Sequence, residues 1–223
     1  MQRVVTPELL DSDAGSTAEV TASLVDLRDF NRLLGGVSLT SVLLQRVACA
    51  KKLSTLSVLD VAGGEGYLLA RVIARLAKKE IAVTGTLLDR AHTHMQPEAH
   101  ALYAVRGDAL SLPCQNGAFD VVTCNLFVHH LEPEQAQQFF REAARVARYA
   151  VVINDLERHW IHWRLAQLGG LIYRSRITRN DAPASVRAAY TCEEMRDLIK
   201  PLGLHFEVVR GFFYRLGICI WKE

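Results

Sequence analysis

Residues 58–67 read Val-Leu-Asp-Val-Ala-Gly-Gly-Glu-Gly-Tyr, so an apolar run leads directly into a glycine-rich turn. The apolar and β-branched residues before the turn predict a buried strand. From Tyr67 to Lys78, apolar residues recur three and four positions apart, which predicts a helix. A strand, a glycine-rich turn and a helix in this order are typical of α/β domains that bind a nucleotide-like ligand, although the same connection also occurs without one.

The spacing of small residues in this turn argues against a dinucleotide. Dinucleotide sites use G-x-G-x-x-G, in which the third glycine lets the helix pack closely on the strand. Those three positions are Ala62, Gly64 and Tyr67 in this chain. The tyrosine removes the close-packing glycine, and Glu65 brings a negative charge to the place where a pyrophosphate would approach. NAD is therefore not expected.

The turn resembles motif I of the class I S-adenosylmethionine-dependent methyltransferases, in which an acidic residue precedes x-G-x-G-x-G. Asp60 is the acidic residue, and Ala62 stands in place of the first glycine. The added methyl group narrows the backbone conformations open to that position, so a partner protein that binds the cofactor without catalysing transfer stays an alternative. The resemblance implies S-adenosyl-L-methionine as the cofactor, with its methionine part bound by Asp60, Ala62, Gly63, Gly64 and Gly66.

Three later segments match the same family in the same order. Predicted strands over 81–88, 101–105 and 119–126 are each followed or ended by the polar residues that the family uses. The resemblance places the cofactor ribose at Asp89 and the adenine at Asp108. The separation of Asp89 from the turn is somewhat long for the family, because a charged run extends the preceding helix. The further cofactor-binding residues implied are Asp89, Arg90, Asp108, Ala109, Asn125 and Leu126.

Composition limits the other classes of function. The chain has 223 residues, of which 50% are hydrophobic and 22% charged, as expected for one globular domain with a substantial core. A net charge of +2 gives little attraction for nucleic acid. The five cysteines are scattered and suggest neither a disulfide framework nor a zinc site. No stretch is long and apolar enough for a membrane span, so we expect a cytoplasmic location.

Alternating strands and helices predict an α/β domain with a mostly parallel sheet. The resemblance makes this a Rossmann-like class I methyltransferase fold, with seven strands, a C-terminal antiparallel hairpin and an N-terminal helical cap. We expect the cap over residues 1–50 and the methyltransferase domain over 51–223, with a helical insertion at about 156–190, in one compact domain. Thr191 opens a capping box that starts the last long helix.

The segment after the fourth strand supplies candidate bases. His129 and His130 are adjacent and lie beyond the carboxyl end of a strand, where open α/β sheets bind ligands, and imidazole can accept a proton near neutral pH. Packing at the entry to the next helix is an equally good interpretation. His159 and Asp155 are alternative bases. No metal is expected, because adjacent histidines cannot easily face one ion and no acidic residue lies at helical spacing from them.

The stretch from 156 to 173 has apolar residues at helical spacing and is expected to lie over the active site. Trp160, Trp163 and Tyr173 either pack as core or line a pocket for an aromatic or lipophilic acceptor. Arg187 either binds an acidic group of the acceptor or makes structural hydrogen bonds. Phe30, in the N-terminal segment, is a further candidate for acceptor contact.

Several segments resemble a narrower group, the bacterial methyltransferases found beside type III polyketide synthases. The matching segments are residues 7–11, 27–33, 154–158, 175–181 and 185–191. This resemblance implies O-methylation of a phenolic, quinone-like or polyketide-derived small molecule in biosynthesis of secondary metabolites. C- or N-methylation of a small molecule is an alternative, and an RNA methyltransferase is less favoured. The fourth motif reads Asn-Leu-Phe-Val, without the Pro-Pro typical of enzymes that methylate nucleobase amines. The sequence leaves open whether the chain forms a homodimer.

Overall fold

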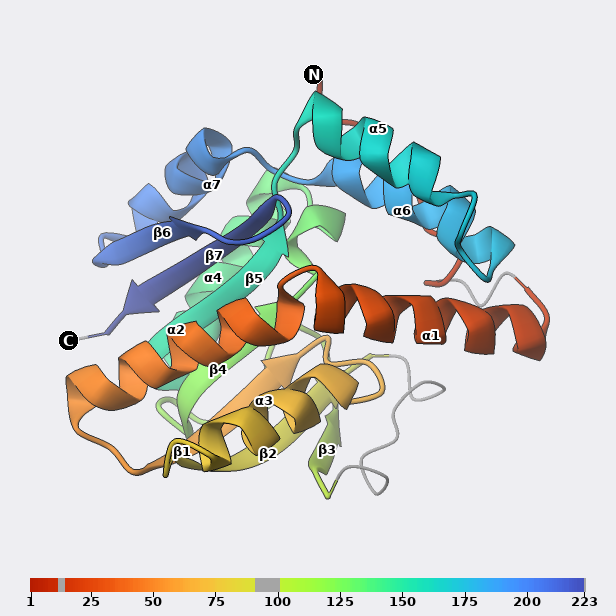
Figure 1. Cartoon of the computed structure of the whole chain (residues 1–223). Helices are drawn as coiled ribbons and strands as arrows, with labels where there is room; N and C mark the ends of the chain where they lie inside the picture. The colour runs from red at the N-terminus through yellow and green to blue at the C-terminus, as the bar shows by residue number, and fades with distance from the viewer. Residues whose placement is uncertain (12–14, 91–100, 223) are drawn as a thin grey trace.

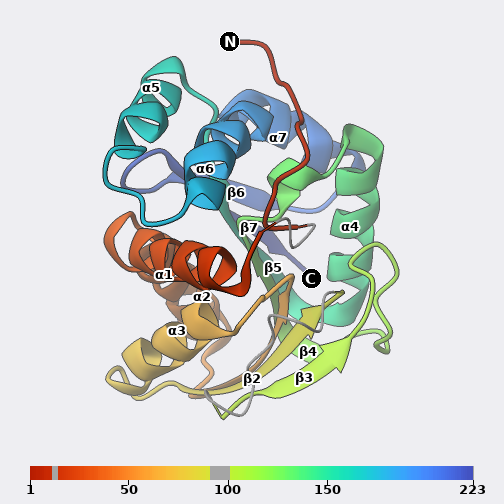
Figure 2. The same cartoon turned by 90° about the vertical axis from the view of Figure 1, so that its right-hand side faces the viewer.

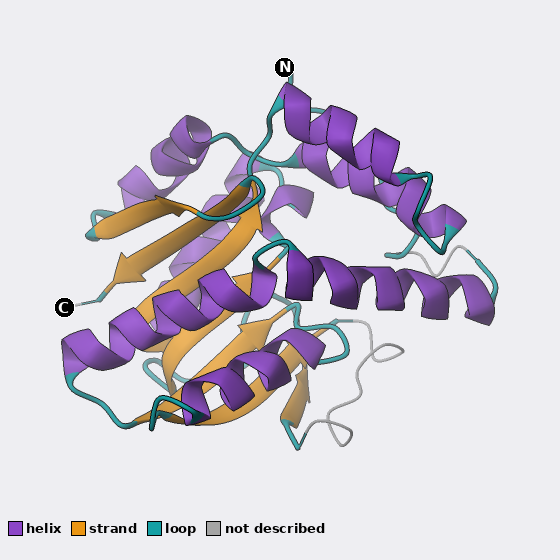
Figure 3. Cartoon of the chain, viewed as in Figure 1, coloured by secondary structure: helices purple, strands orange, loops and turns teal. Residues whose placement is uncertain are grey.

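The computed structural model describes residues 1–11, 15–90 and 101–222. Its described residues form a seven-stranded sheet in the order β3-β2-β1-β4-β5-β7-β6, in which β7 runs antiparallel to both of its neighbours (Figures 1 and 3). This is the expected fold class, with its C-terminal antiparallel hairpin. The strands are β1 (Thr55–Val61), β2 (Ala82–Asp89), β3 (Tyr103–Arg106), β4 (Phe119–Asn125), β5 (Ala147–Leu156), β6 (Phe206–Arg210) and β7 (Arg215–Trp221).

Helices cover both faces of the sheet (Figure 2). On one face α2 and α3 contribute to a buried cluster that includes Leu43, Leu44 and Val72, and on the other face α4 and α7 contribute to a cluster that includes Phe139 and Met195. Beyond the carboxyl ends of the parallel strands, α6 packs against both α1 and α5. The helices are α1 (Thr17–Leu33), α2 (Gly36–Lys51), α3 (Tyr67–Ala77), α4 (Pro133–Val146), α5 (Trp160–Gly169), α6 (Arg176–Ala188) and α7 (Cys192–Ile199), with short 3-10 helices η2 (Val128–His130) and η3 (Lys200–Leu202).

The register of the parallel strands collects the predicted cofactor residues at one edge. Val61 pairs with Leu88 of β2 and with Cys124 of β4. The next residues, Ala62, Asp89 and Asn125, therefore lie side by side at the carboxyl ends of the three strands. Asn125 in turn pairs with Asn154 of β5. Residues distant in sequence are thus neighbours where open α/β sheets bind their ligands.

Helix α2 of the N-terminal region packs into the core beside the sheet. Leu43, Leu44 and Val47 of α2 are fully buried in the same cluster as residues of β1 and α3. The part of the N-terminal region that extends past the sheet is α1, and the residues predicted as an insertion, about 156–190, include α5 and α6.

Strand β5 carries two buried polar residues near its carboxyl end. It continues to Leu156, because residues from Asn154 to Leu156 pair with Gly217, Leu216 and Arg215 of β7. Asn154 and Asp155 therefore lie inside a strand and are buried. The capping box at Thr191 is confirmed, since its side chain accepts from the Glu194 amide and the Glu194 side chain accepts from the Thr191 amide.

Within the described residues, no single helix has both the length and the apolar character of a membrane span. Helices α1 and α2 would satisfy that test only as a pair, and they are bent by 52° relative to each other.

Candidate functional site

The glycine-rich turn after β1 adopts the left-handed conformation at three positions. These are Ala62 (φ 56°), Gly64 (φ 53°) and Gly66 (φ 84°). Glycine adopts this conformation freely, whereas alanine does so at a cost of about 1 kcal/mol. The Ala62 amide donates to the Leu88 carbonyl at 2.8 Å, which ties the turn to the end of β2. The departure from motif I is therefore a strained position that the surrounding backbone holds in place.

Asp60 lies under this turn, almost fully buried. Burial raises the pKa of its carboxyl to about 7, and the nearby charge of Asp89 adds to the rise, while a hydrogen bond from the Asn125 amide opposes it. That Nδ2–Oδ1 bond is 3.4 Å long and joins the ends of β1 and β4. Two predicted cofactor residues, 65 positions apart, are thus brought into contact.

Thr40 of α2 holds Asn125 from the other side. Its hydroxyl donates to Asn125 Oδ1 at 2.7 Å and accepts from Asn154 Nδ2 at 2.9 Å. Asn154 Nδ2 also donates to the Gly36 carbonyl at 2.9 Å. The start of α2 is therefore bonded to the ends of β4 and β5. Sequence reasoning missed Thr40, because nothing in a helix with many apolar residues marks one threonine as a partner of Asn125.

The end of β2 carries Asp89, whose carboxylate accepts from the Gly64 amide at 2.9 Å. The ribose candidate and the glycine-rich turn are thus adjacent, despite the long separation in sequence, and Arg90 next to Asp89 is exposed. Asp108 is exposed beyond β3, where its carboxylate accepts from the Leu110 amide at 2.9 Å. Ala109 beside it packs against the core.

Leu126 follows β4 in the left-handed conformation, with φ 52°. Its amide donates to the Asn154 carbonyl at 3.0 Å. A bulky residue in this conformation is uncommon outside tight turns and sites of function. The turns after β1 and β4 thus show the same backbone feature at neighbouring points of the sheet edge.

Glu65, the acidic residue of the glycine-rich turn, is paired with Arg28 of α1. The two side chains make a bidentate ion pair, with both N–O distances at 2.6 Å, and the Glu65 side chain is 9% exposed. Helix α1 is thereby anchored to the glycine-rich turn. The sequence gives no signal for this pairing, because 37 residues separate the partners.

His129 is buried between two carboxylates. Its Nδ1 lies 2.6 Å from Asp155 Oδ1, and its Nε2 lies 3.5 Å from Glu8 Oε1. Burial alone would lower the pKa of His129, but Asp155 and Glu8 raise it to about 10. In the absence of other ligands the ring is therefore an imidazolium at neutral pH and has no free lone pair with which to act as a base.

His130 keeps more contact with solvent, with 24% of its side chain exposed. Its Nδ1 lies 3.1 Å from Asp11 Oδ2, and its Nε2 lies 4.0 Å from Glu8 Oε1. Glu8 and Asp11 come from the N-terminal segment, which runs alongside α6 (Figure 2). The amides of Leu9 and Leu10 donate to the Asp181 carboxylate of α6, which fixes this segment.

Glu8 and Asp11 were not among the candidates from sequence. Residues 7–11 belong to the segments that resemble the narrower bacterial group, but this resemblance does not link them to the histidines. A lone carboxylate about 120 positions away forms no recognisable pattern with them. Ser185 also belongs to this group, since its hydroxyl donates to Glu8 Oε1 at 2.5 Å. The contact gives Ser185 a structural hydrogen bond.

The two alternative bases are engaged elsewhere. Burial would raise the pKa of Asp155, but His129 holds it below its usual value, and the carboxylate also accepts from the amides of His129 and Leu156. Asp155 therefore orients His129. His159 caps α5, where its Nδ1 accepts from the Ile161 amide at 3.2 Å, and its ring stacks on Tyr214.

The candidate acceptor residues are distributed over different surfaces. Phe30 and Tyr173 contact each other edge to face, with ring centroids 5.3 Å apart, and join α1 to the segment between α5 and α6. Trp163 is half-buried, whereas Trp160 is 61% exposed and thus does not line an enclosed pocket. Arg187 is exposed, and its backbone carbonyl accepts from the Val4 amide.

Two arginines around the start of α6, Arg174 and Arg176, are neutralised by acidic residues. Arg174 pairs with Asp26 and Asp29, at 2.9 and 3.0 Å, and Arg176 pairs with Glu19. Their charge is already compensated within the fold, which weakens the motivation for an RNA methyltransferase.

Comparison with known proteins identifies a methyltransferase domain in this chain. Residues 58–149 match the family model described as a methyltransferase domain. A search of curated proteins found no match. Among solved structures, the chain is similar to the plantazolicin methyltransferase BpumL in complex with SAH, with 14% identity, a TM-score of 0.73, and coverage of 97% of this chain and 94% of that chain. It is also similar to magnesium protoporphyrin IX methyltransferase (ChlM) from Synechocystis PCC 6803 with bound SAH, with 16% identity, a TM-score of 0.54, and coverage of 82% and 83%.

At these identities the solved structures establish the fold. The matched domain adds the chemistry, because it spans the glycine-rich turn, Asp89, Asp108 and Asn125. These residues stand at neighbouring strand ends or on the loops that follow them, where a class I cofactor would lie. Residues 58–149 therefore form a methyltransferase domain, and the chain as a whole has the fold of methyltransferases that were solved with SAH.

Proposed function

We propose that the chain transfers the methyl group of S-adenosylmethionine to a hydroxyl oxygen of a phenolic, quinone-like or polyketide-derived small molecule. The observation that carries this proposal is the cluster of Glu8, His129 and His130 just beyond the Asn125 end of β4. A neutral hydroxyl is a poor nucleophile, so its methylation benefits from groups that remove the proton. His130 of this cluster supplies such a group next to the predicted cofactor site.

In the proposed reaction the acceptor oxygen bonds to the methyl carbon while the carbon–sulfur bond breaks. Sulfur keeps the electron pair, which yields S-adenosylhomocysteine (SAH). The sulfonium already activates the methyl group, so alignment of the two reactants supplies much of the rate. We assign the proton of the hydroxyl to Nε2 of His130, because this ring is the more accessible of the pair and its Nδ1 faces the Asp11 carboxylate.

An aromatic acceptor suits the side chains near this edge. Phe30 and Tyr173 bring two aromatic rings together where α1 meets the insertion. Aromatic rings favour edge-to-face and offset contacts with a further ring. Phe127, which precedes the histidines, lies with its ring 6.5 Å from that of His130 and adds a third aromatic surface.

The test is methyl transfer from labelled S-adenosylmethionine to matched acceptors. The acceptors are a phenol, the corresponding aniline and the corresponding methyl ether, all with the same other ring substituents. We expect label in the phenol product and none from the ether. Label in the aniline alone would refute O-methylation and favour the N-methyl alternative.

The assigned base is tested in the same assay over a range of pH. His130→Gln removes the proposed proton acceptor, and His205→Gln is the matched control, because His205 is 73% exposed beside β6. Turnover of the phenol should fall in the first variant and persist in the second. Equal pH profiles for His130→Gln and the unmodified protein would overturn the assignment.

A further inference from the structure

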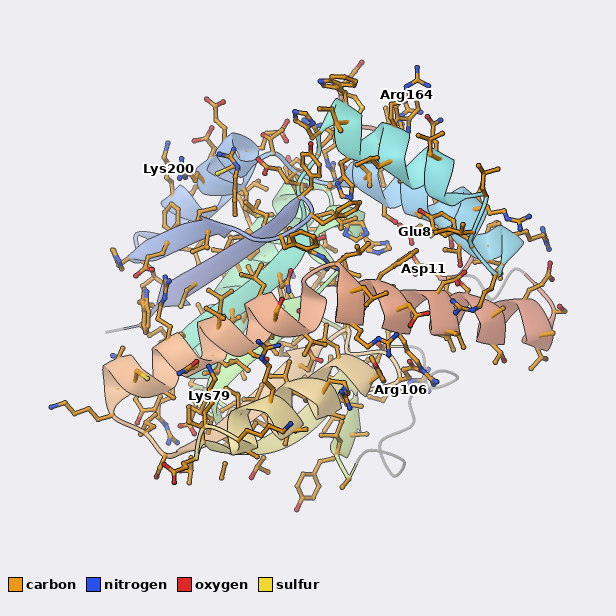
Figure 4. The ribbon with its side chains drawn as sticks, in the orientation of Figure 1. Glu8, Asp11, Lys79, Arg106, Arg164 and Lys200 are labelled. Atoms are coloured by element: carbon orange, nitrogen blue, oxygen red, sulfur yellow. The ribbon has the colours of Figure 1, made fainter. Side chains whose placement is uncertain are left out.

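Glu8, His129 and His130 form a group whose ligand atoms all lie within 4.8 Å of one another. Both histidines direct Nε2 toward the same carboxylate oxygen, at 3.5 Å for His129 and 4.0 Å for His130. Figure 4 places Glu8 and Asp11 between α6 and α1, beyond the carboxyl ends of the strands. Two neighbouring histidines can therefore face one point, because the 3-10 turn of η2 brings their rings to 4.2 Å between centroids.

We propose that Glu8, His129 and His130 bind one divalent transition-metal ion of the type that takes imidazole and carboxylate ligands, such as Zn²⁺. Two ligands at about 2.1 Å from a tetrahedral ion are about 3.4 Å apart. The nitrogen–oxygen separations in the structure are 3.5 Å for His129, which is close to this value, and 4.0 Å for His130, which is somewhat longer. The sequence shows no acidic partner at helical spacing from the histidines, but Glu8 reaches them from the N-terminal segment.

The groups behind these ligands support a metal site. A metal-bound histidine typically presents its other ring nitrogen to a carboxylate or a carbonyl, which fixes the ring and raises its basicity. Asp155 Oδ1 lies 2.6 Å from His129 Nδ1, and Asp11 Oδ2 lies 3.1 Å from His130 Nδ1. Each histidine thus has its own orienting carboxylate, and each leaves Nε2 for the shared point.

Glu8 is held in a similar way. Its side chain is 12% exposed, and the Ser185 hydroxyl donates to Oε1. Hydrogen bonds from Leu9 and Leu10 to Asp181 fix the backbone next to it. The carboxylate is therefore positioned by α6 and is not a freely moving surface group.

Three protein ligands leave coordination positions open, as in catalytic metal sites. The use of the ion rests on the proposed function: an acceptor hydroxyl bound at the open position would lose its proton more readily. In that state His130 would act as a ligand, and the ion would take over activation of the hydroxyl. The metal site itself depends only on the geometry of the three residues.

The test uses the full-length chain without an affinity tag, freed of metal by a chelator. Co²⁺ would be titrated by visible absorption, which reports on tetrahedral nitrogen and oxygen ligands, and Zn²⁺ would be titrated by calorimetry and by displacement of Co²⁺. We expect one equivalent to bind. Glu8→Gln and His130→Asn should each weaken binding at least about 100-fold, and Asp155→Asn about 10-fold to 100-fold, as for other orienting carboxylates. His205→Asn is the matched control and should bind as the unmodified chain does.

The proposal is overturned if the unmodified chain binds neither ion, or if Glu8→Gln binds as tightly as the control. The cluster would then be an ion pair of His129 with two carboxylates and nothing more. Melting temperature and SAH binding, measured without metal, show whether each variant is folded. If the unmodified chain shows no cobalt spectrum but still transfers the methyl group, the metal site alone is refuted. If it shows a cobalt spectrum but transfers no methyl group to any hydroxyl, the proposed function alone is refuted.

Discussion

The hydroxyl of Thr40 joins α2 to the candidate cofactor site, and its removal should loosen that site. Thr40→Val keeps the shape of the side chain but leaves Asn125 Oδ1 without its donor and Asn154 Nδ2 with only the Gly36 carbonyl. Thr40 is fully buried. A buried polar group that loses its partner costs about 1–3 kcal/mol. We expect a loss of about 2 kcal/mol in the free energy of unfolding, which lowers Tm by about 4–8 °C in a chain of this size.

Thr40→Ser is the matched control. It keeps the hydroxyl and removes one buried methyl group, which costs about 1 kcal/mol. Thermal unfolding of the free protein and calorimetric titration with SAH would be measured for both variants. Thr40→Val should weaken SAH binding, because Asn125 no longer has a fixed position from which to contact Asp60, whereas Thr40→Ser should not. If the valine variant is as stable as the serine variant and binds SAH equally well, the network does not act as described.

Three further predictions concern the turn and its neighbours. The folded-state pKa of Asp60, about 7, exceeds the usual value of 3.8, so this residue stabilises the fold below about pH 4 and loses that contribution as pH rises through about 7. In denaturant titrations over this pH range, the free energy of unfolding of the unmodified protein should fall by up to about 4 kcal/mol relative to that of Asp60→Asn. If the two proteins show the same pH dependence, Asp60 does not titrate in this range. Ala62→Gly should change the free energy of unfolding by less than about 1 kcal/mol, because relief of left-handed strain is offset by a more flexible unfolded chain. Ala62→Val should destabilise the protein by more than about 1 kcal/mol, and equal denaturation midpoints for the two variants would contradict strain at this position. Arg28→Met leaves the Glu65 charge buried and should destabilise by about 1–2 kcal/mol, and the double variant with Glu65→Met should recover this loss; a double variant no more stable than the single one would argue against the pairing.

The strand ends that carry the proposed cofactor residues could be predicted from the sequence because their signals are local. Hydrophobic periodicity on either side of the turn predicts β1 and α3, and glycines at Gly64 and Gly66 mark positions where left-handed backbone is needed. The polar residue at the end of each parallel strand then follows from strand order. Even the unusual Ala62 could be identified as the departure, although its positive φ is visible only in the structure.

The surroundings of the candidate active site could not be predicted, because their partners are distant in sequence. Glu8 reaches the histidines, Arg28 reaches Glu65, and Thr40 reaches Asn125, and each contact joins an N-terminal residue to the sheet edge. Single carboxylates, arginines and threonines are common on helices and carry no spacing pattern. Trp160 shows the converse: an aromatic residue at helical spacing suggested a pocket, yet the helix turns it toward solvent.

Calorimetric titration with SAH gives the most direct test that Asp60, the turn and Asp89 hold the cofactor. The unmodified chain should bind one equivalent. Asp89→Asn removes the charge expected to accept from the ribose hydroxyls, and loss of one charge-assisted hydrogen bond of about 1.5–3 kcal/mol should weaken binding about 10-fold to 100-fold. Asp197→Asn is the control, because Asp197 is exposed on α7 and pairs with Lys200, and it should bind as before. Absence of SAH binding to the unmodified chain, or equal affinity in Asp89→Asn and the control, would contradict this placement of the cofactor.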